Sequence, residues 1–178
     1  MNLVTKRLIL REFQLDDFDS VHKYASDPEV CRYSDWGPNT SEDTRKFMKD
    51  VVIEQSRNPR NQFTLAIILK DSSEVIGACS LTRIEPYQGE IGYSLNHEYW
   101  GCGFATEAAH AMLIFAFKEL SLHRVYATCR PKNIGSSRVL EKIGMKKEAH
   151  LREHLFFKGQ WHDSLLYAIL HSELKNGN

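Results

Sequence analysis

Apolar and polar positions alternate along several short segments of the chain, which predicts a series of β-strands. The expected strands are residues 8–13, 63–70, 74–81, 90–95, 124–129, 146–157 and 160–170. The polar turn Asp71-Ser72-Ser73 joins the second and third of these and predicts an antiparallel hairpin. A second hairpin is predicted for the last two strands, with its turn at Lys158-Gly159.

Apolar residues at helical spacing predict four helices between these strands. The first begins at Asp16-Asp17, which places acidic side chains at the positive end of the helix. The second begins at Ser41, where the run Ser-Glu-Asp-Thr supplies an N-cap. The other two are expected over residues 104–120 and 134–143, and Gly144 ends the last one.

The order of the elements places a helix between the strands at 90–95 and 124–129. A helical crossover between two strands of one sheet makes them parallel and is right-handed. No internal repeat or linker divides the chain. The sequence therefore predicts an α+β fold, with a mostly antiparallel mixed sheet and helices on both faces, in a single domain over residues 1–178.

The composition is that of a globular protein, with 42% hydrophobic and 26% charged residues and a formal net charge of zero. No apolar run reaches the roughly 18 residues of a membrane-spanning helix, and no secretory signal is evident, so we expect a cytoplasmic protein without a membrane partner. Neutrality argues against direct binding of nucleic acid. The four widely spaced cysteines predict reduced thiols. The eight histidines occur without an HExxH motif or a Cys/His cluster, so no metal site is expected.

The charges are unevenly distributed along the chain. Residues 16–43 carry eight acidic and two basic side chains, whereas residues 118–158 carry ten basic and four acidic ones. Solvated faces explain most charge runs, but an acidic half for an amine substrate and a basic half for an anionic cofactor produce the same pattern. Both interpretations stay open.

A glycine-containing loop, here called the Gly loop, connects the strand at 90–95 to the helix at 104–120. It reads Trp100-Gly101-Cys102-Gly103-Phe104-Ala105-Thr106. Glycines allow a tight turn, and the first N–H groups of a helix bind anions. A P-loop would continue with Gly-Lys-Ser/Thr, and a dinucleotide-binding loop would have a third Gly or Ala where Thr106 stands, so both of those motifs lose support.

Further segments accompany this loop in a fixed order. They are Thr5-Lys6-Arg7-Leu8-Ile9-Leu10-Arg11, Glu90-Ile91-Gly92-Tyr93, Asn133-Ile134-Gly135-Ser136 and Arg138-Val139-Leu140-Glu141-Lys142-Ile143-Gly144-Met145. Together with the Gly loop they resemble the GNAT superfamily of acetyl-CoA dependent N-acetyltransferases, in particular its RimJ/RimL-like branch, which acts on ribosomal-protein N-termini. The resemblance implies a GNAT-like acyl-CoA N-acyltransferase fold whose central parallel strands splay apart around the pantetheine arm. Relatives of this branch often form dimers, so the resemblance implies a homodimer for this chain as well.

Carried over by position, the resemblance assigns cofactor contacts to three places in the chain. Backbone groups of Tyr93, Ser94 and Leu95 would bind pantetheine and the acetyl carbonyl, the Gly loop would hold the pyrophosphate, and Asn133 would contact the cofactor arm. An N–H group aimed at the thioester oxygen stabilises the oxyanion that develops there.

Side-chain acids and bases are less well defined by the sequence. Many relatives carry a Tyr general acid where Leu140 stands, and some use a Glu where Thr128 stands. Ser136 is the remaining hydroxyl that can donate to the departing thiolate, and its alternative role is a helix N-cap. Glu90 is the carboxylate that can draw the amine proton through water, and its alternative is an exposed strand-end charge.

The absence of a strong base from these motifs bears on the acceptor. An α-amine, with a pKa of about 7.7 to 8.0, is partly neutral near pH 7, whereas the pKa of a lysine amine is about 10.4. We therefore expect direct transfer of acetyl to a protein or peptide N-terminal α-amine. Two alternatives stay open: a small-amine acceptor such as a polyamine or aminoglycoside, attracted by the acidic segment 16–43, and a non-catalytic acyl-CoA sensor.

Overall fold

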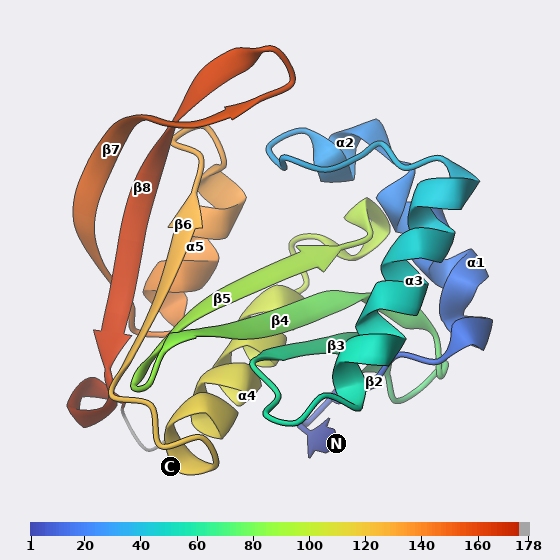
Figure 1. Ribbon diagram of the computed structural model, residues 1–178, viewed down its shortest axis with the longest axis horizontal. Helices are drawn as coiled ribbons and strands as arrows, with labels where there is room; N and C mark the ends of the chain where they lie inside the picture. The colour runs from blue at the N-terminus through green and yellow to red at the C-terminus, as the bar shows by residue number, and fades with distance from the viewer. Residues whose placement is uncertain (175–178) are drawn as a thin grey trace.

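A single eight-stranded sheet, with strand order β1-β2-β3-β4-β5-β6-β8-β7, organises the computed structural model, which describes residues 1–174 (Figure 1). Neighbouring strands are antiparallel, and the β5–β6 pair alone is parallel. The strands are β1 (Asn2–Val4), β2 (Leu8–Glu12), β3 (Gln62–Leu69), β4 (Val75–Glu85), β5 (Gln88–Leu95), β6 (Arg124–Cys129), β7 (Lys146–Phe157) and β8 (Gln160–Leu170). The α-helices are α1 (Phe18–Ala25), α2 (Pro28–Cys31), α3 (Ser41–Gln55), α4 (Phe104–Lys118) and α5 (Ile134–Lys142).

The predicted order of strands and helices is confirmed, with two additions and one correction from the structure. The short strand β1 and the one-turn helix α2 were not predicted. Helix α2 begins at Pro28, which suits a first turn because proline has no N–H to leave unpaired. The N-cap of α3 is Thr40 and not Ser41: the Asp43 N–H donates to Thr40 Oγ1 at 3.2 Å, while the Thr40 N–H donates to Asp43 Oδ2 at 2.9 Å.

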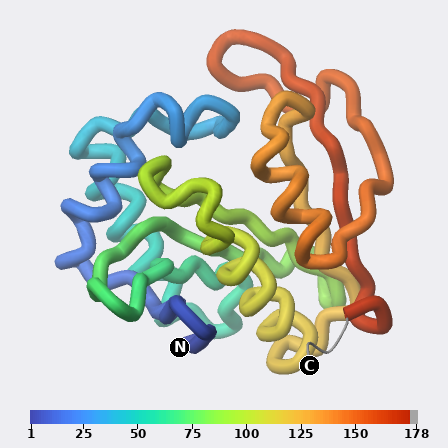
Figure 2. Tube along the Cα trace, turned by 180° about the vertical axis from the view of Figure 1, so that it is seen from behind, coloured from blue at the N-terminus to red at the C-terminus, as the bar shows by residue number. Residues whose placement is uncertain are grey.

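Two apolar cores lie on opposite faces of the sheet. Along β3, Leu65 and Ile67 point into the core that includes α4, whereas Ala66 and Ile68 point into the core that includes α1 and α3. Figure 2, the view from behind, shows α4 and α5 on the face of the sheet that is turned away from the viewer in Figure 1. Because helices cover both faces, β3 is buried almost throughout. None of the helices within residues 1–174 has the length and apolar character needed to cross a bilayer.

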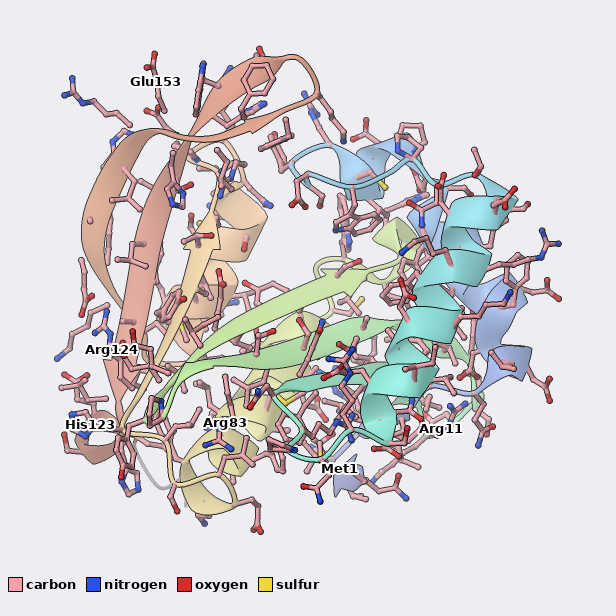
Figure 3. All side chains as sticks on the ribbon, in the orientation of Figure 1. Met1, Arg11, Arg83, His123, Arg124 and Glu153 are labelled. Carbon is pink, nitrogen blue, oxygen red and sulfur yellow. The ribbon has the colours of Figure 1, made fainter. Side chains whose placement is uncertain are left out.

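The two parallel strands β5 and β6 pair only at their N-terminal ends. The pairs are Gln88 with Arg124, Gly89 with Val125 and Glu90 with Tyr126. Beyond Glu90 the strands diverge as a V, with Arg124 at the paired end (Figures 1 and 3). Each strand stays fully paired on its other edge, β5 with β4 up to Leu95 and β6 with β8 up to Cys129. The predicted splay is confirmed, and it leaves the inner edge of β5 without a strand partner.

Candidate functional site

A cleft of ≈ 1080 Å³ lies beside the parting strands β5 and β6. Its lining comes from β3 to β6, from α1, α3 and α5, from the segment 33–39 after α2, and from the end of β7. Lys158, in the β7–β8 turn, donates to the carbonyl of Cys31 at 2.7 Å. The hairpin and the α2 region therefore meet at one margin of the cleft.

Unpaired polar atoms concentrate in this cleft. Thr64 Oγ1, Ser94 Oγ and Arg130 Nη1 are buried, line the cleft and have no hydrogen-bond partner. Within residues 1–174, Arg83 Nε is the one other buried side-chain nitrogen or oxygen without a partner. Leaving a buried polar group unpaired costs about 1–3 kcal/mol, so native proteins rarely do so. The concentration of three such atoms indicates a site built to receive a polar ligand.

Glu90 lies on β5 at the point where the strands part, and its side chain lines the cleft. The residue is half-buried, so the exposed strand-end position considered from the sequence is wrong. Burial raises the pKa of the Glu90 carboxyl, and charge interactions with His154 and Arg130 offset only part of that effect. A carboxylate with a raised pKa accepts a proton more readily than an exposed one.

Ser136 lies in the first turn of α5 and contacts Tyr93 on β5. Tyr93 Oη is 3.0 Å from Ser136 Oγ and donates to the Ser136 carbonyl oxygen, also at 3.0 Å. The N-cap of α5 is Asn133, whose Oδ1 accepts from the Ser136 N–H at 3.1 Å, so the capping role considered for Ser136 is wrong. Burial raises the pKa of the Tyr93 phenol, which keeps it protonated near neutral pH.

The Gly loop lies at the N-terminal end of α4, outside the lining of the cleft. Gly101 and Gly103 have φ angles of 78° and 81°, in the left-handed region that favours glycine. Within residues 1–174, no backbone N–H group of residues 101–106 donates to another group of the chain. These free donors, at the positive end of a helix, provide what an anion site requires.

The N-terminal segment holds the Gly loop in place. Arg7 Nη1 donates to the Cys102 carbonyl at 3.0 Å, Arg7 Nε donates to Glu107 Oε2 at 2.7 Å, and the guanidinium lies 4.3 Å from the centroid of the Phe104 ring. Thr5 Oγ1 donates to the other oxygen of Glu107 at 2.6 Å. The motif that includes Thr5 and Arg7 was noted from the sequence without a role, because nothing local indicates contact with residues 95 or more positions away.

The sequence-predicted site residues fall into two places. Those that line the cleft are Glu90, Tyr93, Ser94, Asn133 and Ser136. Leu95 is buried at the end of β5, and its carbonyl accepts from Trp100 Nε1 at 3.0 Å, which ties the strand to the start of the Gly loop. The free edge of β5 connects the two places, since Tyr93 and Ser94 line the cleft and Leu95 bonds to Trp100. Within residues 1–174, no group of three or more His, Cys, Asp or Glu side chains is placed to hold a metal.

The chain is similar in sequence and in structure to known acetyltransferases. The model of the acetyltransferase (GNAT) domain family matches residues 7–146. The uncharacterized N-acetyltransferase YnaD of Bacillus subtilis (strain 168) is 37% identical over 174 residues, 97% of this chain and 99% of that protein. The ribosomal protein uS5-alanine N-acetyltransferase of Escherichia coli (strain K12) is 26% identical over 121 residues, 66% of this chain and 62% of that protein. The crystal structure of a GNAT-family acetyltransferase from Bacillus anthracis superimposes with a TM-score of 0.88 at 36% identity, covering 97% of this chain and 100% of that one.

Proposed function

The chain belongs to the GNAT family of acetyltransferases and is an acetyl-CoA dependent N-acetyltransferase, and we propose that its acceptor is the α-amine at the N-terminus of a protein or peptide. The family and the GNAT fold expected from the sequence are confirmed. Membership of an enzyme family decides against the non-catalytic sensor. The predicted single domain, the homodimer and the cytoplasmic location stay predictions, the last supported by four free cysteines.

The base available in the cleft is the observation that carries the acceptor assignment. Glu90, the candidate base, is a half-buried carboxyl group whose pKa is raised by burial. The pKa values of an α-amine and a lysine amine differ by about 2.5 units, so the α-ammonium loses its proton at a cost roughly 3 kcal/mol lower. A site with this base suits the α-amine. The name of the E. coli relative, which acts on an alanine of ribosomal protein uS5, supports the same acceptor class.

Acetyl-CoA fits the two places as one extended ligand. The free N–H groups of residues 101–106 in the Gly loop hold the diphosphate, and the unpaired edge of β5 at Tyr93, Ser94 and Leu95 holds the pantetheine arm. Asn133 uses its side-chain oxygen to cap α5, so its amide NH₂ is the group left to contact the arm. When bound, the thioester supplies an activated acetyl group.

Different residues of the cleft serve different steps of the acetyl transfer. Glu90 takes the amine proton through water, and a β5 N–H near Leu95 stabilises the oxyanion. Tyr93 donates its one proton to the Ser136 carbonyl oxygen and holds Ser136 Oγ 3.0 Å from its own oxygen, and Ser136 Oγ donates its proton to the departing thiolate. A C–N bond forms as the C–S bond breaks, and no enzyme side chain becomes acetylated.

The Tyr93–Ser136 pair makes a testable contribution to this transfer. We expect Ser136→Ala to lower kcat by roughly 10-fold, because a hydrogen bond to a charged group contributes about 1.5–3 kcal/mol. Tyr93→Phe is expected to lower kcat less, and the double variant to match Ser136→Ala, because Tyr93 acts only by positioning Ser136. Steady-state kinetics at saturating acetyl-CoA measures these values.

Tyr167→Phe is the matched control, since this buried phenol bonds to Glu141 and does not line the cleft. Its kcat is expected to stay close to that of the unmodified enzyme. Additive losses in the double variant, or an unchanged kcat in Ser136→Ala, would contradict this joint role of Tyr93 and Ser136.

An acceptor screen tests the proposed function directly. One peptide carries a free α-amine and a blocked lysine, a second carries a blocked α-amine and a free lysine, and spermidine is the third acceptor. Thiol release measures the rate, and mass spectrometry locates the acetyl group. We expect the first peptide to react at least 10-fold faster, in keeping with the difference in amine pKa. Equal turnover of the lysine peptide would overturn the proposal.

A small polyamine is the second candidate acceptor. Three carboxylates on the margin of the cleft, those of Asp35, Asp43 and Asp50, favour a polycation. The same screen decides, because faster reaction of spermidine than of the free α-amine peptide would select this candidate.

A further inference from the structure

Arg130 is the most heavily buried charged side chain in the lining of the cleft. It follows the last residue of β6, is only 8% exposed, and lies over the ring of Phe157 with its guanidinium carbon 5.9 Å from the ring centroid. A buried guanidinium is costly unless it is paired, because five N–H donors and a charge lose their hydration. Such a residue needs a partner.

The described part of the chain does not supply that partner. Arg130 Nη1 is fully buried and bonds to no group of residues 1–174. The charges of Asp35 and Glu90 act on Arg130, yet neither carboxylate forms an ion pair with it within those residues. Arg130 therefore contributes a buried, unpaired donor to the wall of the cleft.

The position of Arg130 in the cleft indicates which ligand its unpaired N–H donor binds. Along β6 the residues alternate between the core, which contains Ala127 and Cys129, and the opposite face. Arg130 lines the cleft together with Glu90 and Thr128, whereas the free N–H groups of the Gly loop lie elsewhere, at the start of α4. The unpaired donor is thus placed on the side of the acceptor and away from the proposed diphosphate site.

We propose that Arg130 is a specificity-determining residue that binds a carbonyl or carboxylate oxygen on the carbon next to the one bearing the acceptor amine. This inference rests on the proposed α-amine acceptor and narrows it to α-aminoacyl compounds. A peptide N-terminus offers a neutral carbonyl oxygen at that place, and a free amino acid offers a carboxylate. A simple alkylamine or a polyamine offers neither, and it leaves the guanidinium unpaired.

Three acceptors of similar size separate these cases: alanine with its carboxylate, alaninamide with a neutral carbonyl, and isopropylamine with neither. Each is assayed with the unmodified enzyme, Arg130→Met, Arg130→Lys and the control Arg45→Met, which removes an exposed arginine from α3 outside the cleft. The readout is kcat/KM per free amine, expressed as the ratio of each oxygen-bearing acceptor to isopropylamine. Taking the ratio between variants cancels the intrinsic reactivity of each amine.

We expect Arg130→Met to lower this ratio by roughly 10- to 100-fold, the range for a hydrogen bond to a charged group, and Arg45→Met to leave it unchanged. Arg130→Lys keeps the charge but loses the fork of donors, so its ratio is expected between the other two. If Arg130→Met lowers the ratio for alaninamide, the group that Arg130 binds is a peptide carbonyl. If it lowers the ratio for alanine alone, that group is a free carboxylate. An equal effect of Arg130→Met on all three acceptors would overturn the proposal.

A second measurement needs only the unmodified enzyme, in case the variants fail to fold. N-acetylalaninamide is expected to inhibit as a product at least 10-fold more strongly than N-isopropylacetamide, since only the former presents the second carbonyl. Equal inhibition would overturn the role of Arg130 and leave the α-amine acceptor intact. Acetylation of lysine side chains alone in the acceptor screen would overturn both.

Discussion

Replacing Gly103 by Val is expected to lower kcat/KM for acetyl-CoA by roughly 10²-fold or more. Gly103 has a φ of 81°, a conformation that a β-branched residue adopts only under strain of about 1–3 kcal/mol. The loop is expected to relieve this strain by rotating its peptide groups, which turns the free N–H groups of residues 101–106 away from one another. Loss of two charge-assisted hydrogen bonds corresponds to roughly 10²- to 10⁴-fold in affinity.

Acetyl-pantetheine makes this test specific, because it carries the same thioester without the diphosphate. The enzyme with Gly103 is expected to prefer acetyl-CoA strongly, and Gly103→Val to remove most of that preference. Steady-state kinetics with both donors gives the two values of kcat/KM. An equal loss for both donors would show that the Gly loop does not hold the diphosphate.

Gly159 provides a matched control for backbone strain. It has a φ of 77° in the β7–β8 turn, and a Cβ there meets no other atom within 4 Å, while a Cβ at Gly103 comes no closer than 3.5 Å to Arg7. Gly159→Val therefore introduces similar strain without a steric clash and far along the chain from the Gly loop. Its KM for acetyl-CoA is expected to stay unchanged. Thermal unfolding of both variants separates a loss of stability from a loss of binding.

Local sequence signals account for most of the fold. The ends of β7 and β8 were predicted to the residue because Lys158-Gly159 is a turn signal, and both residues have positive φ angles in the structure. The parallel orientation of β5 and β6 was predicted correctly because the helix α4 connects them. Helix α2 was not predicted because a proline inside a helical pattern usually marks a break, whereas Pro28 begins a new turn.

The parts of the site that depend on tertiary contacts were not predictable in the same way. The sequence assigned Tyr93 only backbone contacts, since nothing near it in the chain indicates that its hydroxyl meets Ser136, 43 positions away. Arg130 was counted only as one of ten bases in a basic segment, because alternation gives the face of a side chain but not its lack of a partner. Asn133 caps α5 in addition to its proposed cofactor contact, and the choice between Asn133 and Ser136 as the cap depends on backbone geometry.

Glu90→Gln is expected to lower kcat by roughly 10²-fold, the lower end of the usual range for a general base. The change keeps the size of the side chain and its position where β5 and β6 part, but it removes the group that accepts the amine proton. KM for acetyl-CoA is expected to change little, since Glu90 makes none of the proposed diphosphate and pantetheine contacts. Steady-state kinetics with the free α-amine peptide measures both constants.

The pH dependence of this variant separates a base from a charge that merely attracts the amine. Burial raises the pKa of Glu90, and only its deprotonated form accepts a proton, so kcat is expected to fall as the pH drops through that raised pKa. In Glu90→Gln this acid limb should disappear, and Glu85→Gln, at the exposed end of β4, should retain it. An unchanged kcat in Glu90→Gln would remove Glu90 from the chemistry. If Glu90→Gln raises KM for the peptide but keeps the acid limb, Glu90 only attracts the amine. A proton acceptor must be deprotonated for turnover, so its removal would abolish that limb.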